Sequence, residues 1–184
     1  MKICIDPGHG GYDPGAVETR GSTIALEKSI NLSASFMLAG VLNSLGHTPI
    51  MTRIYDLYNS LKDRVAIADN SKSALFISVH CNSFDQPEPR GFEVYHFPSS
   101  SDGEKVAHNI LDQASNVSWL HQHGDGCKES KFYVLRYTHI PAVLVELSFL
   151  SNQEDLENLL KPECLFELMH YIGKGIHESL TTSS

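Results

Sequence analysis

Short apolar runs alternate with longer amphipathic segments along this chain. The apolar runs predict strands at residues 3–6, 48–52, 74–80, 92–97 and 142–147. Elsewhere apolar residues recur every three or four positions, which predicts helices at residues 25–45, 60–70, 104–117, 152–160 and 163–180. Several of the strands are apolar at successive positions, as is typical of strands that are covered on both faces. This alternation of strands and helices predicts an α/β fold with a mostly parallel sheet.

Local signals support several of these boundaries. Ser60 and Asp63 have the spacing of a capping box at a helix start, and Gly46 stands where the first long helix is expected to stop. The glycine-rich stretch up to about Ser22 and the polar stretch at residues 119–131 are predicted to be loops. Residues 1–180 are expected to form the domain, and residues 181–184 a polar tail or the start of a linker.

Composition narrows the class of protein. A chain of 184 residues that is 41% hydrophobic suits one domain with a sizeable core. The net charge of −8 and the lack of a Lys/Arg cluster argue against nucleic acid as a partner. The four widely spaced cysteines are expected to be free thiols: Cys4, Cys81, Cys127 and Cys164.

Segments for membrane insertion or export are not evident in the sequence. The longest apolar runs fall short of the roughly 18 residues that span a bilayer, so we expect no membrane span. We expect no signal peptide, because a strand-like run with turn residues follows the first two residues at once. We therefore expect a chain made in the cytosol and released by another route, or a domain of a larger secreted protein, and we expect a monomer.

Side chains with metal-binding chemistry follow three of the predicted strands. His9, His80 and Glu146 come at the ends of separate apolar runs, and Glu27 opens the first helix. Because ligand sites in open α/β sheets lie at the carboxyl ends of the strands, these side chains are expected to converge. Two histidines and a carboxylate form a common catalytic zinc set, and a further carboxylate can act as a base on a water molecule. Glycines around His9 give the loop the freedom to turn sharply there.

Each of these residues, taken alone, also fits a structural role. A histidine at a strand end is commonly a hydrogen-bonded structural group, and an acid such as Glu27 stabilises a helix N-terminus. Spacing alone leaves both readings open. Cys81 is expected to face away from His80, in the core, because successive strand residues point to opposite faces. The stretch HQHGDGC, which starts at His121, is predicted to be a polar surface loop, and His139 is a candidate for the edge of the site.

Five ordered sequence blocks carry a resemblance to a known family. The blocks are IDPGHGGYDPGA, LEKSINL, LFISVHCNSF, GFEVYHF and FYVLRYTHIPAVLVELSFLSNQED, and they run from about residue 3 to residue 160. Together they resemble the zinc-dependent N-acetylmuramoyl-L-alanine amidases of bacterial and phage cell-wall hydrolases, both endolysins and autolysins. The resemblance covers nearly the whole chain, and five blocks in the family's order make a specific signal.

The resemblance implies a fold, a cofactor and a substrate. It implies a single αβα domain with a twisted, mostly parallel six-stranded sheet. It implies one Zn²⁺ per chain, bound by His9, Glu27 and His80, with Glu146 as the catalytic glutamate. It implies that the substrate is peptidoglycan, cut at the amide between N-acetylmuramic acid and L-alanine, so that the protein acts at the bacterial cell wall.

Departures from the family pattern leave the four core positions untouched. Relatives often have a small residue at Cys81, glycine at Ser148 and asparagine at His139, so His139 is a candidate for altered substrate contacts. Two rival functions remain open from the sequence: a zinc peptidase that cuts within the stem peptide, and a wall-binding module without catalysis. A domain stapled by a structural zinc is a third reading, which predicts unfolding on chelation.

Overall fold

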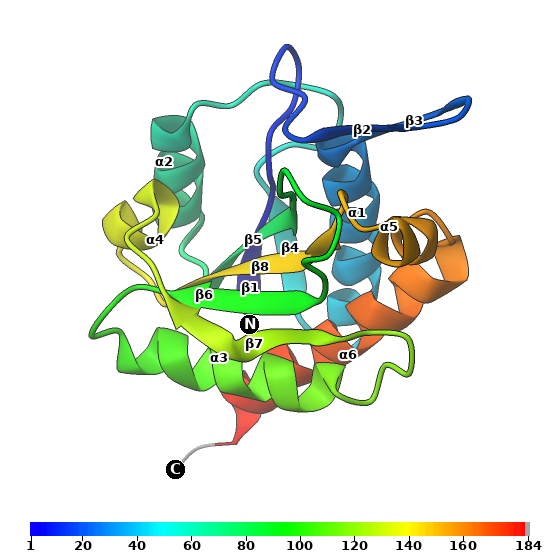
Figure 1. The fold of residues 1–184 in the computed structure, drawn as a ribbon. Coiled ribbons are helices and arrows are strands. Elements are labelled where there is room, and N and C mark those ends of the chain that lie inside the picture. Colours follow the sequence, from blue (N-terminus) through cyan, green and yellow to red (C-terminus); the bar gives the residue numbers. More distant parts are fainter. Residues whose placement is uncertain (183–184) are drawn as a thin grey trace.

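Six strands form one sheet in the order β4-β1-β5-β8-β6-β7. Figure 1 shows the computed structural model with the β7 edge of this sheet toward the viewer. The structure describes residues 1–182. The strands are β1 (Lys2–Pro7), β4 (Thr48–Met51), β5 (Leu75–Asn82), β6 (Phe92–His96), β7 (Gln122–Glu129) and β8 (Ala142–Phe149). The strands β4, β1, β5 and β8 are parallel, whereas β6 pairs antiparallel with β8. The predicted α/β fold with a mostly parallel, six-stranded sheet is therefore confirmed.

Helices cover both faces of this sheet. The larger core joins one face to α1 (Glu27–Ser44), α3 (Ser101–Ala114) and α6 (Pro162–Thr181), with α5 (Gln153–Leu159) beside them. A smaller core joins the other face to α2 (Leu61–Ser71) and α4 (Tyr133–Tyr137), which lie next to each other in Figure 1. The chain thus forms the three layers of an αβα arrangement.

Side chains alternate along the central strands, so that apolar side chains enter the larger core and polar side chains point to the opposite face of the sheet. On β5, Ile77 and Val79 enter the larger core, whereas Ser78 and His80 point to the opposite face. On β8, Val145 enters the same core and Glu146 points away from it. Polar side chains therefore gather on the α2–α4 face, where these two short helices leave part of the sheet uncovered.

The strand order reverses beside β1. Helix α1 connects β1 to β4 on one side of it, and α2 connects β4 to β5 on the other side. Ligand sites in such sheets form at this reversal, outside the carboxyl ends of the strands. His9 follows β1 and His80 lies near the carboxyl end of β5, so the topology brings both histidines to this place.

Several predicted boundaries need correction. Residues 17–26, expected in a loop and at a helix start, form a hairpin of β2 (Val17–Arg20) and β3 (Thr23–Leu26), and α1 begins only at Glu27. The predicted loop at 119–131 contains the edge strand β7, which was missed because its residues are mostly polar and include two glycines. Of the predicted tail at 181–184, Thr181 ends α6, and residues 183–184 lie outside the described part of the chain.

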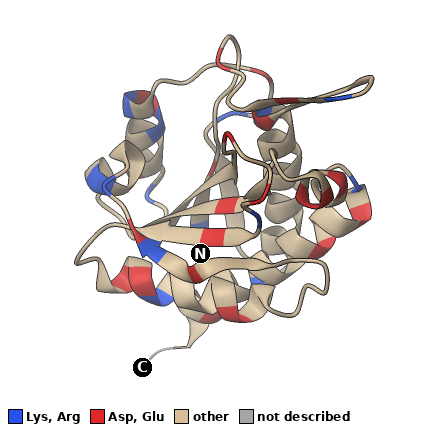
Figure 2. Cartoon of the chain, viewed as in Figure 1, with Lys and Arg blue, Asp and Glu red and all other residues tan. Residues whose placement is uncertain are grey.

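Charged residues of both signs are spread over the helices and loops, as Figure 2 shows. The acidic positions on β6 and β8 lie side by side, since Glu93 and Glu146 are cross-strand partners. Among residues 1–182, none of the helices is long and apolar enough to cross a membrane.

Candidate metal centre and active site

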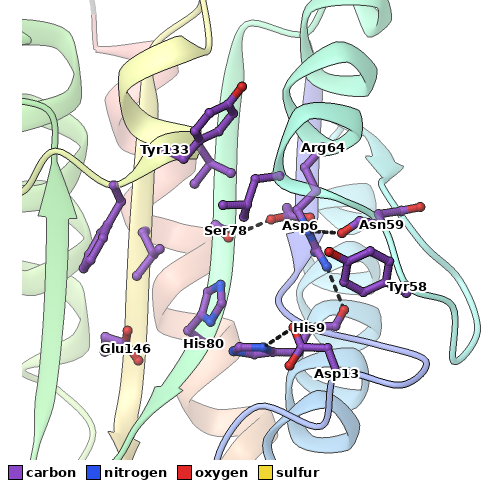
Figure 3. Close-up of a pocket in the computed structure, with 14 residues that line it drawn as sticks. Asp6, His9, Asp13, Tyr58, Asn59, Arg64, Ser78, His80, Tyr133 and Glu146 are labelled. Carbon is purple, nitrogen blue, oxygen red and sulfur yellow. Dashed lines mark hydrogen bonds and ion pairs between the residues drawn. The ribbon is translucent and has the colours of Figure 1, made fainter.

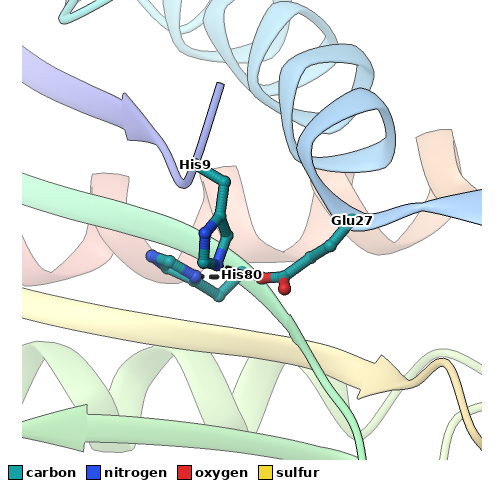
Figure 4. Close-up of side chains that lie close together, drawn as sticks. All are labelled: His9, Glu27 and His80. Carbon is teal, nitrogen blue, oxygen red and sulfur yellow. Dashed lines mark hydrogen bonds and ion pairs between the residues drawn. The ribbon is translucent and has the colours of Figure 1, made fainter. Parts of the chain in front are cut away.

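The structure brings His9, Glu27 and His80 together, as Figure 4 shows. One potential ligand atom from each residue lies within 4.8 Å of those of the other two. Glu27 Oε1 lies 3.2 Å from His9 Nε2 and 3.0 Å from His80 Nδ1. Three elements supply these side chains: the loop after β1, the first turn of α1, and β5.

Close backbone packing makes this approach possible. A Cβ atom at Gly8 would lie 2.3 Å from His80 Cε1, and one at Gly15, where φ is +66°, would lie 2.4 Å from Glu27 Oε2. Side chains at either position would therefore push a cluster member aside. The glycines of the loop allow the turn and also admit the two neighbouring side chains.

Additional hydrogen bonds fix the orientation of the cluster. His9 Nδ1 donates to Asp13 Oδ2 at 2.9 Å, which leaves Nε2 facing the cluster. Glu27 Oε2 accepts the Ala16 backbone N–H at 2.8 Å. Metal-binding histidines usually donate their second N–H to a carboxylate or carbonyl group in this way. Asp13 was not predicted to have a role, because its only signal in the sequence is its place four residues after His9 in the same loop.

Contacts within the cluster shift the pKa values of Glu27 and His9 in opposite directions. Burial raises the pKa of the Glu27 carboxyl, but hydrogen bonds from His80 and His9 outweigh burial and hold this pKa well below its usual range. Burial lowers the pKa of His9, yet its contacts with Glu27 and Asp13 outweigh that effect and leave the pKa raised. The site thus contains a buried anion that attracts positive charge. Its two imidazoles and one carboxylate are a ligand set that suits Zn²⁺.

Glu146 lies on β8, directly across from His80 on β5. Its Oε2 atom is buried and has no hydrogen-bond partner among residues 1–182. Burial raises the pKa of this carboxyl well above its usual value, and the nearby carboxylates of Glu27 and Glu93 raise it further. A buried acid with a raised pKa beside a cluster of ligands is a common feature of active sites.

His9, His80 and Glu146 line one pocket, shown in Figure 3. The pocket has a volume of about 430 Å³ and extends across the α2–α4 face of the sheet. Aromatic side chains stand on its walls, with Tyr58 before α2 and Tyr133 on α4. Glu27 contacts both histidines but does not line the pocket. The loop after β1, strand β5 and strand β8 therefore present two candidate metal ligands and the Glu146 carboxylate to one opening.

Other residues that the sequence analysis singled out lie elsewhere. His139 precedes β8 and lines a different pocket, where its Nδ1 is 2.8 Å from Asp69 Oδ2; the structure does not bring it to the cluster. Cys81 is buried in the larger core, as expected, and burial raises the pKa of its thiol. His123 lies on β7 and bonds to the Arg90 carbonyl oxygen.

The fold and the cluster define a class of protein: an α/β domain with a candidate metal-binding site at the reversal of its strand order. The chain belongs to the family described as N-acetylmuramoyl-L-alanine amidase, which it matches over residues 3–178. The resemblance read from the five sequence blocks is thereby confirmed.

Individual relatives agree with this assignment. The chain is 35% identical over 159 residues to the N-acetylmuramoyl-L-alanine amidase LytC of Bacillus subtilis. This match covers 85% of the present chain and 31% of LytC. The chain is 37% identical to the probable cell wall amidase LytH of Staphylococcus epidermidis, over 83% of this chain and 49% of LytH. The chain thus spans at most half the length of these two relatives. Among solved structures, the amidase AmiC2 of Nostoc punctiforme superposes with a TM-score of 0.91 at 32% identity, covering 99% of this chain and 98% of AmiC2.

Proposed function

We propose that this chain is a zinc-dependent hydrolase that cleaves the amide between N-acetylmuramic acid and L-alanine in peptidoglycan. The observation that carries the proposal is the cluster of His9, Glu27 and His80 in an amidase-family fold. The two histidines of this cluster share one pocket with Glu146. Relatives named as amidases of the cell wall support the same substrate. The proposed place of action is therefore the bacterial cell wall.

One Zn²⁺ per chain would be held by His9, Glu27 and His80. Their nitrogen and oxygen atoms already converge, and the carboxylate is held as an anion, so the donor set fits the ion. When bound, zinc supplies a Lewis acid that polarises a carbonyl oxygen and lowers the pKa of a water molecule. Asp13 keeps the His9 ring oriented for this role through the bond to Nδ1.

Glu146 is the proposed general base and acid. It lies outside the three-residue cluster, so its carboxylate is free to accept a proton from the attacking water. The same proton then passes to the departing amine of L-alanine, which leaves Glu146 ionised again. A water O–H bond and the C–N bond break, while C–O and N–H bonds form, so the hydrolysis balances.

A digest of purified peptidoglycan tests which bond is cut. The proposal predicts new L-alanine amino termini and no new reducing sugar ends. New termini at other stem residues would reassign the chain as a stem peptidase, and reducing ends would reassign it as a glycosidase. Binding to the wall without any product would favour a non-catalytic module.

The proposed catalytic unit is the domain of residues 1–180, acting as a monomer. Every proposed ligand and Glu146 come from one chain, so the site is complete without a second copy. Light scattering on the purified chain tests this, and a stable dimer that loses activity on dilution would contradict it.

Zinc affinity is expected to rise with pH through the range above the ordinary pKa of histidine. Because its pKa is raised, His9 keeps a proton that zinc must displace, so zinc binding releases a proton near neutral pH. Without metal, the raised pKa of His9 increases the free energy of unfolding at pH values below the ordinary pKa of histidine. This contribution is lost as the pH rises through the raised pKa of His9 in the folded chain. Titration calorimetry in buffers of different ionisation enthalpy measures the proton release. Buffer-independent enthalpies at pH 7 would show that His9 is already neutral.

A further inference from the structure

Three consecutive backbone carbonyl groups at the proposed metal-binding loop accept hydrogen bonds from two arginines. The Pro7 oxygen accepts from Arg53 Nε at 3.0 Å and from Arg64 Nη1 at 2.8 Å. The Gly8 oxygen accepts from Arg53 Nη2 at 2.9 Å, and the His9 oxygen from Arg64 Nη2 at 2.8 Å. Charged donors make stronger hydrogen bonds than neutral ones, so this segment is held firmly.

Both arginines are almost fully buried, each with 3% of its surface exposed. Arg64 comes from α2 and pairs with the buried Asp6 through a contact of 2.7 Å between Nη1 and Oδ1. Arg53 follows β4 and has its donors on backbone carbonyl groups. Buried charges are costly unless every donor finds a partner, so ordinary packing alone gives little reason for two guanidinium groups here.

The contacts on Gly8 and His9 determine the conformation of His9. The Gly8 carbonyl belongs to the peptide plane before the His9 Cα atom, and the His9 carbonyl belongs to the plane after it. Fixing both planes fixes φ and ψ of His9. Its φ is +58°, in the left-handed region that a residue with a Cβ atom rarely adopts. In this conformation the ring contacts Glu27 and lies nearly perpendicular to the His80 ring, with the two ring centroids 5.0 Å apart.

Arg53 also connects this loop to the helix that supplies Glu27. Its Nη2 atom donates to the Gly8 oxygen and, at 2.8 Å, to the Lys28 oxygen. Gly8 precedes His9 and Lys28 follows Glu27 in the sequence. One nitrogen atom therefore bridges the backbones next to two proposed metal ligands.

We propose that Arg53 and Arg64 are positioning residues that hold His9 and Glu27 in the geometry that zinc requires before the ion arrives. This inference rests on the proposed metal site. Lysine keeps the charge but lacks the fork of donors, so it cannot hold two carbonyl groups at these angles. Loss of the fork releases the peptide planes around His9 and leaves the ligand set less ordered without metal.

The test compares the Zn²⁺ dissociation constants of wild type, Arg53→Lys and Arg64→Lys, together with the visible absorption of their Co²⁺ forms. We expect each variant to bind zinc about 10- to 100-fold more weakly, as is typical when groups that orient metal ligands are changed. The Co²⁺ spectrum, which reports ligand geometry, is expected to change in both variants. Arg136→Lys, at an exposed position on α4, is the matched control and should change neither quantity.

A second control separates positioning from general destabilisation. Ile172→Val in the core of α6 is expected to lower the melting temperature without changing zinc affinity or the Co²⁺ spectrum. Unchanged affinity and spectrum in both arginine variants would overturn the inference, as would variants that remain unfolded even with excess zinc. A wild-type chain that binds no zinc would instead refute the proposed metal site itself.

Discussion

Replacing Glu146 with glutamine is expected to slow amide cleavage by about 10²- to 10⁴-fold while leaving zinc content unchanged. Glutamine has nearly the same shape but cannot accept the proton of the attacking water. Glu146 lies on the neighbouring strand to His80 and is not a member of the three-residue cluster, so the ion keeps its ligands. Initial rates of L-alanine terminus release, measured beside the zinc content of each sample, give the result.

The same variant is also expected to be more stable without metal. Burial and the carboxylates of Glu27 and Glu93 raise the pKa of Glu146, so its ionised form costs stability at neutral pH. Glutamine removes that charge and should raise the melting temperature. The exposed Glu157→Gln on α5 is the control and should keep full activity. Normal turnover by Glu146→Gln would remove this residue from the mechanism.

Replacing His80 with alanine is expected to weaken zinc binding by more than about 100-fold. Changing a group that merely orients a ligand costs about 10- to 100-fold, and losing one of three proposed ligands costs more. The His80→Ala variant also leaves Glu27 Oε1 without the 3.0 Å contact to Nδ1. Zinc content after dialysis against a weak chelator measures the loss, and activity should fall in parallel.

The matched control for this variant is His139→Ala. His139 is an exposed histidine whose ring contacts Asp69 and lines a different pocket. Its replacement should leave zinc content and cleavage unchanged, which also tests whether His139 has any part in substrate binding. Full zinc occupancy in His80→Ala would contradict its assignment as a ligand.

The sequence predicted the central strands because their apolar runs are long and unmistakable. It ended two of them too early, however. Residues 74–80 and 142–147 were expected to stop near His80 and Glu146, whereas β5 continues to Asn82 and β8 to Phe149. Polar residues on the pocket face look like the end of a strand in the sequence. Both side chains therefore leave the face of the sheet near its carboxyl edge, and they still converge.

Strands whose residues do not alternate between apolar and polar could not be predicted from the sequence pattern. Strand β7 pairs along an edge with β6, and its mostly polar residues resemble a loop. The β2–β3 hairpin is short and largely exposed. Asp13, Arg53 and Arg64 were missed for another reason: their roles depend on backbone carbonyl groups and ring orientations that only the folded chain defines.

Zinc reconstitution of the metal-free chain tests whether amide cleavage depends on one bound zinc ion. The chain would be stripped with a chelator, shown by circular dichroism to stay folded, and supplied with increasing Zn²⁺ before each peptidoglycan digest. We expect no release of L-alanine termini without metal, and then a rate that rises to its maximum at one equivalent of zinc. Cleavage at the full rate by the metal-free chain would show that the reaction does not need zinc.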